Sequence, residues 1–158
     1  MSGFGQKMQG DWKKFQDALK TAENVDYNKM HKQMGEAFVS NIHLRFVDQV
    51  DPQGEPWKKG YKKSGQTLTR NATLSSSFTY KASAKHVEVG SNVIYAAIHH
   101  FGGKIRAKKK NFLKFNIDGR WAQKKYVVMP KREIVGFSKP DEQDIATIFN
   151  RFITGGRK

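Results

Sequence analysis

The sequence predicts an α+β domain in which a long helix of the N-terminal half and a C-terminal helix pack on a small antiparallel sheet, with a basic β-hairpin projecting from it. Three observations predict this class: a long apolar stripe of helical period, apolar–polar alternation in mid-chain, and a capped amphipathic segment near the end. The 158 residues have the length of one domain. A chain of this size buries enough surface for a core without disulfides. We expect a single domain over residues 1–158.

The first third of the chain predicts two helices. Residues 1–10 are rich in Gly, Ser and Gln and are expected to form a loose arm. An apolar stripe from Trp12 to Ala22 predicts a short helix, and Asp26 is a typical N-cap for a longer one. This second helix should stop near Asp51, because a residue before proline is pushed out of helical geometry. The stripe of the long helix comprises Tyr27, Met30, Met34, Phe38, Ile42 and Phe46.

A turn and two strands are expected next. The stretch DPQGEPW is typical of a fixed turn and carries Trp57. Alternation of apolar and polar residues predicts short strands near residues 78–83 and 86–91. The compact apolar segment that follows, Val93–Phe101, predicts one or two helical turns.

Glycines then end that helical segment. Gly102 and Gly103 follow it directly, and glycine tolerates the left-handed backbone of a helix stop. This pair therefore permits a sharp turn or a close approach of backbone.

Residues 104–130 predict a basic β-hairpin. Leu113, Phe115 and Ile117 alternate with polar residues, and Asp118-Gly119 is a strong signal for a hairpin turn. Residues 121–129 are expected to form the returning arm. The lysines of its polar face and tip are Lys108, Lys109, Lys110, Lys114, Lys124 and Lys125.

The last helix has a clear start signal. Ser138 is followed by Pro140 and Asp141, which suit the first turn of a helix. The expected apolar face comprises Ile145, Ile148, Phe149 and Phe152. Gly155-Gly156 should end the helix, and a basic tail closes the chain over residues 154–158.

The charge of +15 is concentrated in two central stretches. Residues 57–85 carry seven basic and no acidic side chains, and residues 104–132 carry eleven basic side chains against Asp118 alone. Such a field attracts nucleic acid, anionic membranes or acidic protein surfaces, although a solvated basic face is the simpler interpretation.

Composition excludes several classes of protein. No apolar run approaches the ~20 residues of a membrane span, and the N-terminus lacks the apolar core of a secretory signal. The chain has no cysteine, so it has neither disulfides nor thiolate metal sites, which fits assembly in a cytoplasm. His99 and His100 are adjacent and would point about 100° apart on a helix, which disfavours a shared metal. We expect no enzyme, no cofactor and no metal.

Two segments resemble a known family. They are VGSNVIYAAIHHFGGKI, residues 89–105, and MPKREIVGFSKPDEQDI, residues 129–145. Their pattern resembles the phage virion-morphogenesis family, the tail-completion proteins of Mu-like and P2-like phages. The chain departs from this pattern at His100, where the family usually has Gln, and at Glu133, which interrupts an apolar pair. The matching residues are Val89, Gly90, Ser91, Tyr95, Ala96, Ile98, His99, Phe101, Gly102, Gly103, Pro130, Arg132, Gly136 and Ser138.

The resemblance implies a structural subunit that completes the tail or joins tail and capsid, as part of a hexameric ring. The implied partners are copies of the chain, the tail tube or sheath and the head–tail connector. DNA passes through such a ring without specific binding, and no membrane partner is expected. The implied location is the neck or tail end of the virion, with the host cytoplasm as the place of assembly.

Roles can be expected for several matched residues. Tyr95, Ile98 and Phe101 should pack their segment onto the sheet. His99 is either a backbone-bonding residue at a neighbouring strand or subunit, or a satisfied core histidine. Arg132 either pairs with a carboxylate or lies exposed to solvent.

The basic hairpin leaves a second function open. Nucleic-acid-binding modules interleave exposed aromatic residues with basic ones. Phe112, Phe115 and Trp121 could serve such a role, but their alternation predicts a buried face. An enzyme of lysis or DNA processing would need a catalytic group that the sequence does not offer.

Overall fold

The computed structural model describes residues 13, 16–17, 19–60, 65–69, 72–108, 111–117 and 119–154. It confirms the α+β class, with helices and paired antiparallel strands. The arm predicted at 1–10, Lys109, Lys110 and the tail beyond Thr154 lie outside the described residues. The elements are α2 (Tyr27–Asp48), η1 (Ser75–Ser77), β1 (Phe78–Ala82), β2 (Val87–Ser91), α3 (Ala96–Phe101), β3 (Gly103–Arg106), β4 (Leu113–Ile117), β5 (Arg120–Lys124), β6 (Tyr126–Met129) and α4 (Lys139–Ile153).

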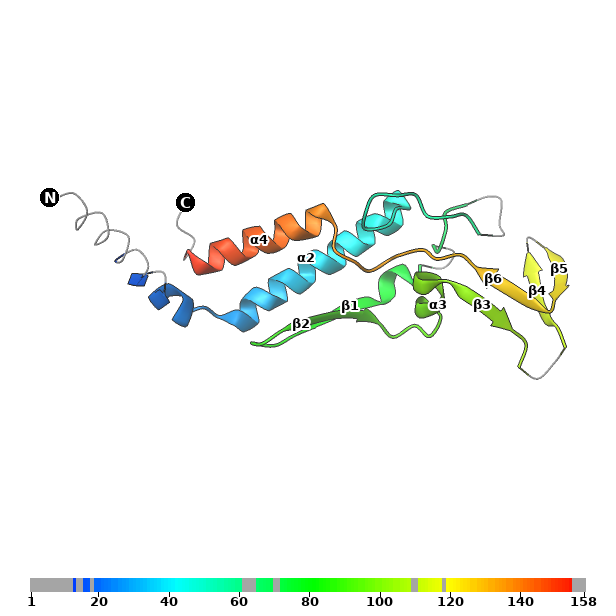
Figure 1. Ribbon diagram of the computed structural model, residues 1–158, viewed down its shortest axis with the longest axis horizontal. Coiled ribbons are helices and arrows are strands. Elements are labelled where there is room, and N and C mark those ends of the chain that lie inside the picture. The colour runs from blue at the N-terminus through cyan, green and yellow to red at the C-terminus, as the bar shows by residue number, and fades with distance from the viewer. Residues whose placement is uncertain are drawn as a thin grey trace, which may run out of the picture.

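The helices and the first strand pair form three layers. Helix α2 lies in the middle, with α4 on one side and the β1–β2 pair on the other (Figure 1). The last helix therefore packs on α2, whereas the sequence predicted that it would pack on a sheet. The strands likewise do not form one sheet: β1 pairs with β2, β3 with β6, and β4 with β5, all antiparallel.

Helix α2 follows its predicted start and stripe. Asp26 caps it, because its side chain accepts a hydrogen bond from the backbone N–H of Lys29 at 2.9 Å. Most of the stripe is buried, from Met30 to Phe46. The helix ends at Asp48, earlier than the proline signal predicted, because Gln49 turns left-handed with φ 62° and bonds back to the Arg45 carbonyl.

The core lies between α2 and the later segments of the chain that pack against its buried side. Trp57, from the predicted turn, packs edge-on against Phe46 with ring centroids 5.1 Å apart. Its indole N–H donates to the Glu133 carbonyl oxygen at 2.9 Å. The buried cluster comprises Phe38, Ile42, Phe46, Trp57, Leu74, Phe78 and Ile134.

A glycine sets the distance between α2 and the first strand pair. A Cβ atom on Gly35 would lie 2.5 Å from the Tyr80 ring of β1. Glycine forms helices less readily than alanine, but at this position it allows the aromatic ring to lie against the helix backbone.

The returning arm of the predicted hairpin is divided in two. Strand β5 pairs with β4 and ends at Lys124, and β6 then pairs with β3. Strand β3 was not predicted, because its four residues are all exposed and show no apolar–polar alternation. Of β6, only Val127 is buried.

No helix within the described ranges is long and apolar enough to cross a membrane.

Replacing Gly35 with alanine tests the helix–strand contact. Alanine favours the helix by up to about 1 kcal/mol, but forcing its methyl group into the Tyr80 ring costs about 1–3 kcal/mol. We expect Gly35→Ala to lower the free energy of unfolding, measured by urea denaturation. In a Tyr80→Ala background, Gly35→Ala should raise the free energy of unfolding. A rise of this free energy in the wild-type background would contradict the contact.

Candidate assembly surface

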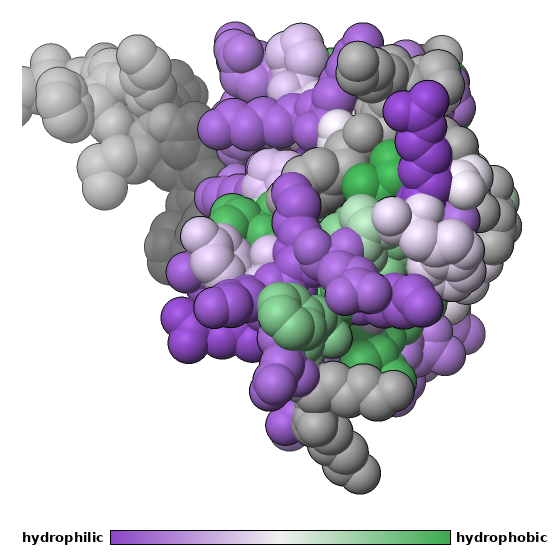
Figure 2. Space-filling view, turned by 90° about the vertical axis from the view of Figure 1, so that its right-hand side faces the viewer, coloured by the Kyte–Doolittle hydropathy of each residue, from purple (hydrophilic) through white to green (hydrophobic). Residues whose placement is uncertain are grey.

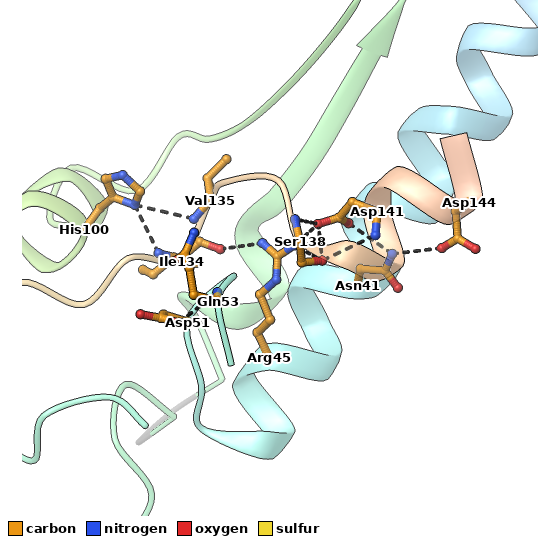
Figure 3. Close-up of polar contacts among 10 residues, drawn as sticks. All are labelled: Asn41, Arg45, Asp51, Gln53, His100, Ile134, Val135, Ser138, Asp141 and Asp144. Atoms are coloured by element: carbon orange, nitrogen blue, oxygen red, sulfur yellow. Dashed lines mark hydrogen bonds and ion pairs between the residues drawn. The ribbon is translucent and has the colours of Figure 1, made fainter. Parts of the chain in front are cut away.

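A buried ion pair joins the two long helices. The Arg45 guanidinium of α2 bonds to the Asp141 carboxylate in the first turn of α4, and these residues are only 5% and 1% exposed (Figure 3). Arg45 also donates to the Ile134 carbonyl oxygen at 3.0 Å and to the Ser138 hydroxyl at 3.2 Å. One cation thus bonds to α4 and to the segment that leads into it.

Polar neighbours complete this pair. Asp141 accepts from the Ser138 backbone N–H at 2.8 Å, which is half of a reciprocal capping box at the helix start that the sequence predicted. The Asn41 amide donates to Asp141 at 3.0 Å and to Asp144 at 2.9 Å (Figure 3). Burial lowers the pKa of Arg45, and the charge of Asp141 acts in the opposite direction. The buried charge of Arg45 is compensated, because the carboxylate, hydroxyl and carbonyl oxygens that it bonds to lie around it.

The connecting segment, residues 130–138, is fixed to α3 as well. The Ile134 backbone N–H donates to Nδ1 of His100 at 3.1 Å, and Ile134 is 1% exposed. Burial lowers the pKa of His100, which favours the neutral ring that can accept this bond. His100, which stands where the family pattern usually has Gln, therefore has a structural role.

Arg132 also fixes the connecting segment, in a way the sequence did not predict. It is buried, so the expectation of an exposed side chain is wrong. Its Nε donates to the Lys58 carbonyl oxygen at 2.6 Å, where a carboxylate partner was the other expectation. Its backbone N–H donates to the His99 carbonyl oxygen at 2.9 Å.

His99 is not a satisfied core histidine. Its Nδ1 is buried and has no hydrogen-bond partner among the described residues. Its ring meets that of Tyr95 edge-on, with centroids 5.9 Å apart. Burial, and then the nearby charge of Arg132, lower the pKa of His99.

Two aromatic side chains at the ends of α3 are exposed. Tyr95 and Phe101 are 45% and 71% exposed, so the expectation that they pack on the sheet is wrong. Val93 and Ala96 make the inward contact with the core instead. Gly102 ends the helix as predicted, with φ 69°, and a Cβ there would lie 2.7 Å from the Lys131 nitrogen.

Beyond α3 lies the β arm, which we define as the described residues from 103 to 129. It extends past the end of the helical layers (Figure 1). Phe112 and Trp121 were expected on a buried face, but they are 48% and 69% exposed in the isolated chain. The exposed apolar residues of the arm are Ile105, Phe112, Trp121, Tyr126 and Val128.

Basic residues lie between these apolar ones. Figure 2 looks onto this end of the molecule, where hydrophilic and hydrophobic side chains are interleaved. Nζ of Lys104 lies 3.9 Å from the Tyr126 ring centroid, and Nζ of Lys114 lies 5.5 Å from that of Trp121. Lys108, Lys114, Lys124 and Lys125, which the sequence singled out, are all exposed residues of the arm.

A model of the phage virion morphogenesis family matches residues 10–153. The chain belongs to this family. The match confirms the resemblance drawn from residues 89–105 and 129–145. No curated protein and no solved structure gives a match.

For a virion morphogenesis protein, the exposed arm is a better candidate site than the buried polar cluster. Asp141 is shielded from solvent, and its bonds go to neighbouring side chains and backbone. In the part of the chain that the structure describes, no group of three or more acidic or histidine side chains could hold a metal ion. The arm, in contrast, offers accessible apolar and basic side chains together.

Removing the buried cation should destabilise the fold strongly. Arg45→Met leaves the Asp141 carboxylate buried without its counter-charge, and breaking such a pair costs about 3–5 kcal/mol. Urea denaturation measures this loss. Adding Asp141→Asn should recover part of it, because the uncompensated charge is then removed.

The matched control is Arg151→Met, since Arg151 bonds to Gln33 on the surface. That change should alter stability by no more than about 0.5 kcal/mol. An Arg45→Met protein as stable as the control would contradict the structural role of the ion pair.

Proposed function

We propose that this virion morphogenesis protein is a structural subunit that completes the tail or joins tail and head, acting in a hexameric ring. Its place is the neck or tail end of the virion, after assembly in the host cytoplasm. The proposed partners are further copies of the chain, the tail tube or sheath, and the connector. The observation that carries this proposal is the β arm, which extends from the fold without a core of its own.

The arm needs burial that the isolated chain does not supply. Strands β3, β4 and β5 contain no buried residue, and β6 contributes Val127 alone. Two-stranded pairs of this kind are marginally stable in water unless another surface covers them. Exposed apolar residues gathered at one end of a protein mark an interaction site. A neighbouring subunit in a ring is a partner that covers the arm in every copy.

The charge of the arm favours an acidic partner surface. Its described residues include Lys104, Arg106, Lys114 and Arg120, and no described residue of the arm is acidic. Complementary charge raises the rate of docking and fixes its register. A ring repeats each contact, so modest pairwise contacts add up to a stable assembly.

We propose no catalytic role. The most convergent polar groups of the described chain are those around Arg45 and Asp141, and they hold the helices together. DNA would pass through the ring without specific binding.

One observation favours nucleic acid as an alternative partner. Exposed aromatic rings beside lysines, as at Tyr126 and Trp121, are the pattern that single-stranded nucleic-acid binders use. Binding of that kind weakens steeply with salt and needs no ring.

Native mass spectrometry of the purified protein, alone and with purified tails, tests the ring. We expect a hexamer, either in solution or on the tail. A protein that stays monomeric in both samples, yet binds DNA tightly at low salt and loses this binding at high salt, would contradict the proposal and support the alternative.

A further inference from the structure

A groove lies where the end of α2 meets the start of α4. Its volume is about 610 Å³, and the residues that line it come from α2, the turn at 50–54 and the segment 137–142. Leu44 and Phe137 line it and are 55% and 65% exposed. The ring of Phe137 is held edge-on against Phe38, at 5.4 Å between centroids, so the apolar part of the groove is formed by positioned side chains.

The groove is acidic. Among the described residues that line it are three carboxylates, those of Asp48, Asp51 and Glu142, and one exposed cation, Lys139, which together carry a net charge of −2. Arg45 also lines the groove, but its charge is already paired with Asp141. Asp51 is held in place by the backbone N–H groups of Gln53 and Glu55, each at 2.9 Å.

The β4–β5 pair has the complementary chemistry. It presents the exposed Trp121 beside Lys114, whereas the groove presents exposed apolar residues beside carboxylates. Arg120, the neighbour of Trp121 in β5, is a second exposed cation of the pair on its other face. An aromatic ring beside a cation suits an apolar pocket flanked by anions, because the ring is desolvated while the charges pair at its rim.

We propose that the β4–β5 pair of one copy docks in the groove of the next copy, so that copies join head to tail. The proposal rests on the proposed ring and names its repeating contact. The donor and acceptor surfaces are different parts of the chain, which makes the contact heterologous, and such contacts generate rings when the rotation closes. Trp121 of the donor lies against Leu44 and Phe137 of the acceptor.

Charge reversal tests the contact with two variants. The arm variant is Lys114→Glu with Arg120→Glu, and the groove variant is Asp48→Lys with Glu142→Lys. Each alone should lose the oligomer at concentrations where the wild type assembles, since like charges then face each other. An equimolar mixture should recover it, because each acidic arm meets a basic groove and each basic arm an acidic groove. Native mass spectrometry should show the two variants in a 1:1 ratio.

The matched control for the groove is an exposed leucine elsewhere. Leu44→Lys should abolish the oligomer, whereas Leu19→Lys, at a leucine 50% exposed outside the groove, should leave it unchanged. Urea denaturation of each variant shows whether the monomer fold is kept.

Cross-linking distinguishes the possible failures, since the chain has no cysteine of its own. With a short bis-maleimide reagent, a Gln123→Cys, Gln53→Cys double variant should give a ladder of linked copies, and each single variant should give none. Cross-linking of Gln123→Cys alone would show an arm-to-arm contact and overturn the docking. A hexamer that all the charge and leucine variants keep would overturn the docking and leave the ring standing. A wild type that never assembles, alone or on tails, would overturn both.

Discussion

The buried ion pair between Arg45 and Asp141 fixes how the two long helices meet. It joins α2 to the first turn of α4, and the same guanidinium bonds to Ile134 and Ser138 of the connecting segment. A buried charge is costly unless its partners are in place, so the connecting segment has few alternative paths. That segment in turn positions His100 and Trp57, and so α3 and the turn after α2.

Buried apolar side chains are unevenly distributed over the molecule. The core cluster draws on α2, Trp57, the start of β1 and the connecting segment, while the β arm adds only Val127 to the buried residues. The β arm therefore begins at the well-packed part of the fold, but it buries few apolar side chains itself. In the proposed ring this division is useful, because a surface that is uncovered in the isolated chain becomes stable when a neighbouring copy covers it.

Local signals predicted much of the fold, and longer-range contacts account for what they missed. Asp26 and Ser138 were found because a cap acts over a few residues, and the α2 stripe because burial follows helical period. Arg45 was not recognised, because a cation beside a stripe is usually solvated and its partner lies 96 residues away. The burial of Arg132 was not predicted for the same reason, because the carbonyl group to which its side chain donates is also far away in the sequence. Strand β3 has no apolar–polar alternation of its own. Alternation in β4 and β5 indicates a sheet face but does not say whether the rest of the chain buries it.

In the proposed assembly, the helical layers fold on their own and the β arm is stabilised by its contact with a neighbour. Amide hydrogen exchange of the isolated protein and of the assembled form measures this most directly. We expect α2 amides to exchange slowly in both forms, whereas the paired amides of β4 and β5 should exchange fast in the monomer and slow down on assembly. Amides of β4 and β5 that are as protected as those of α2 in the monomer, and unchanged on assembly, would contradict it.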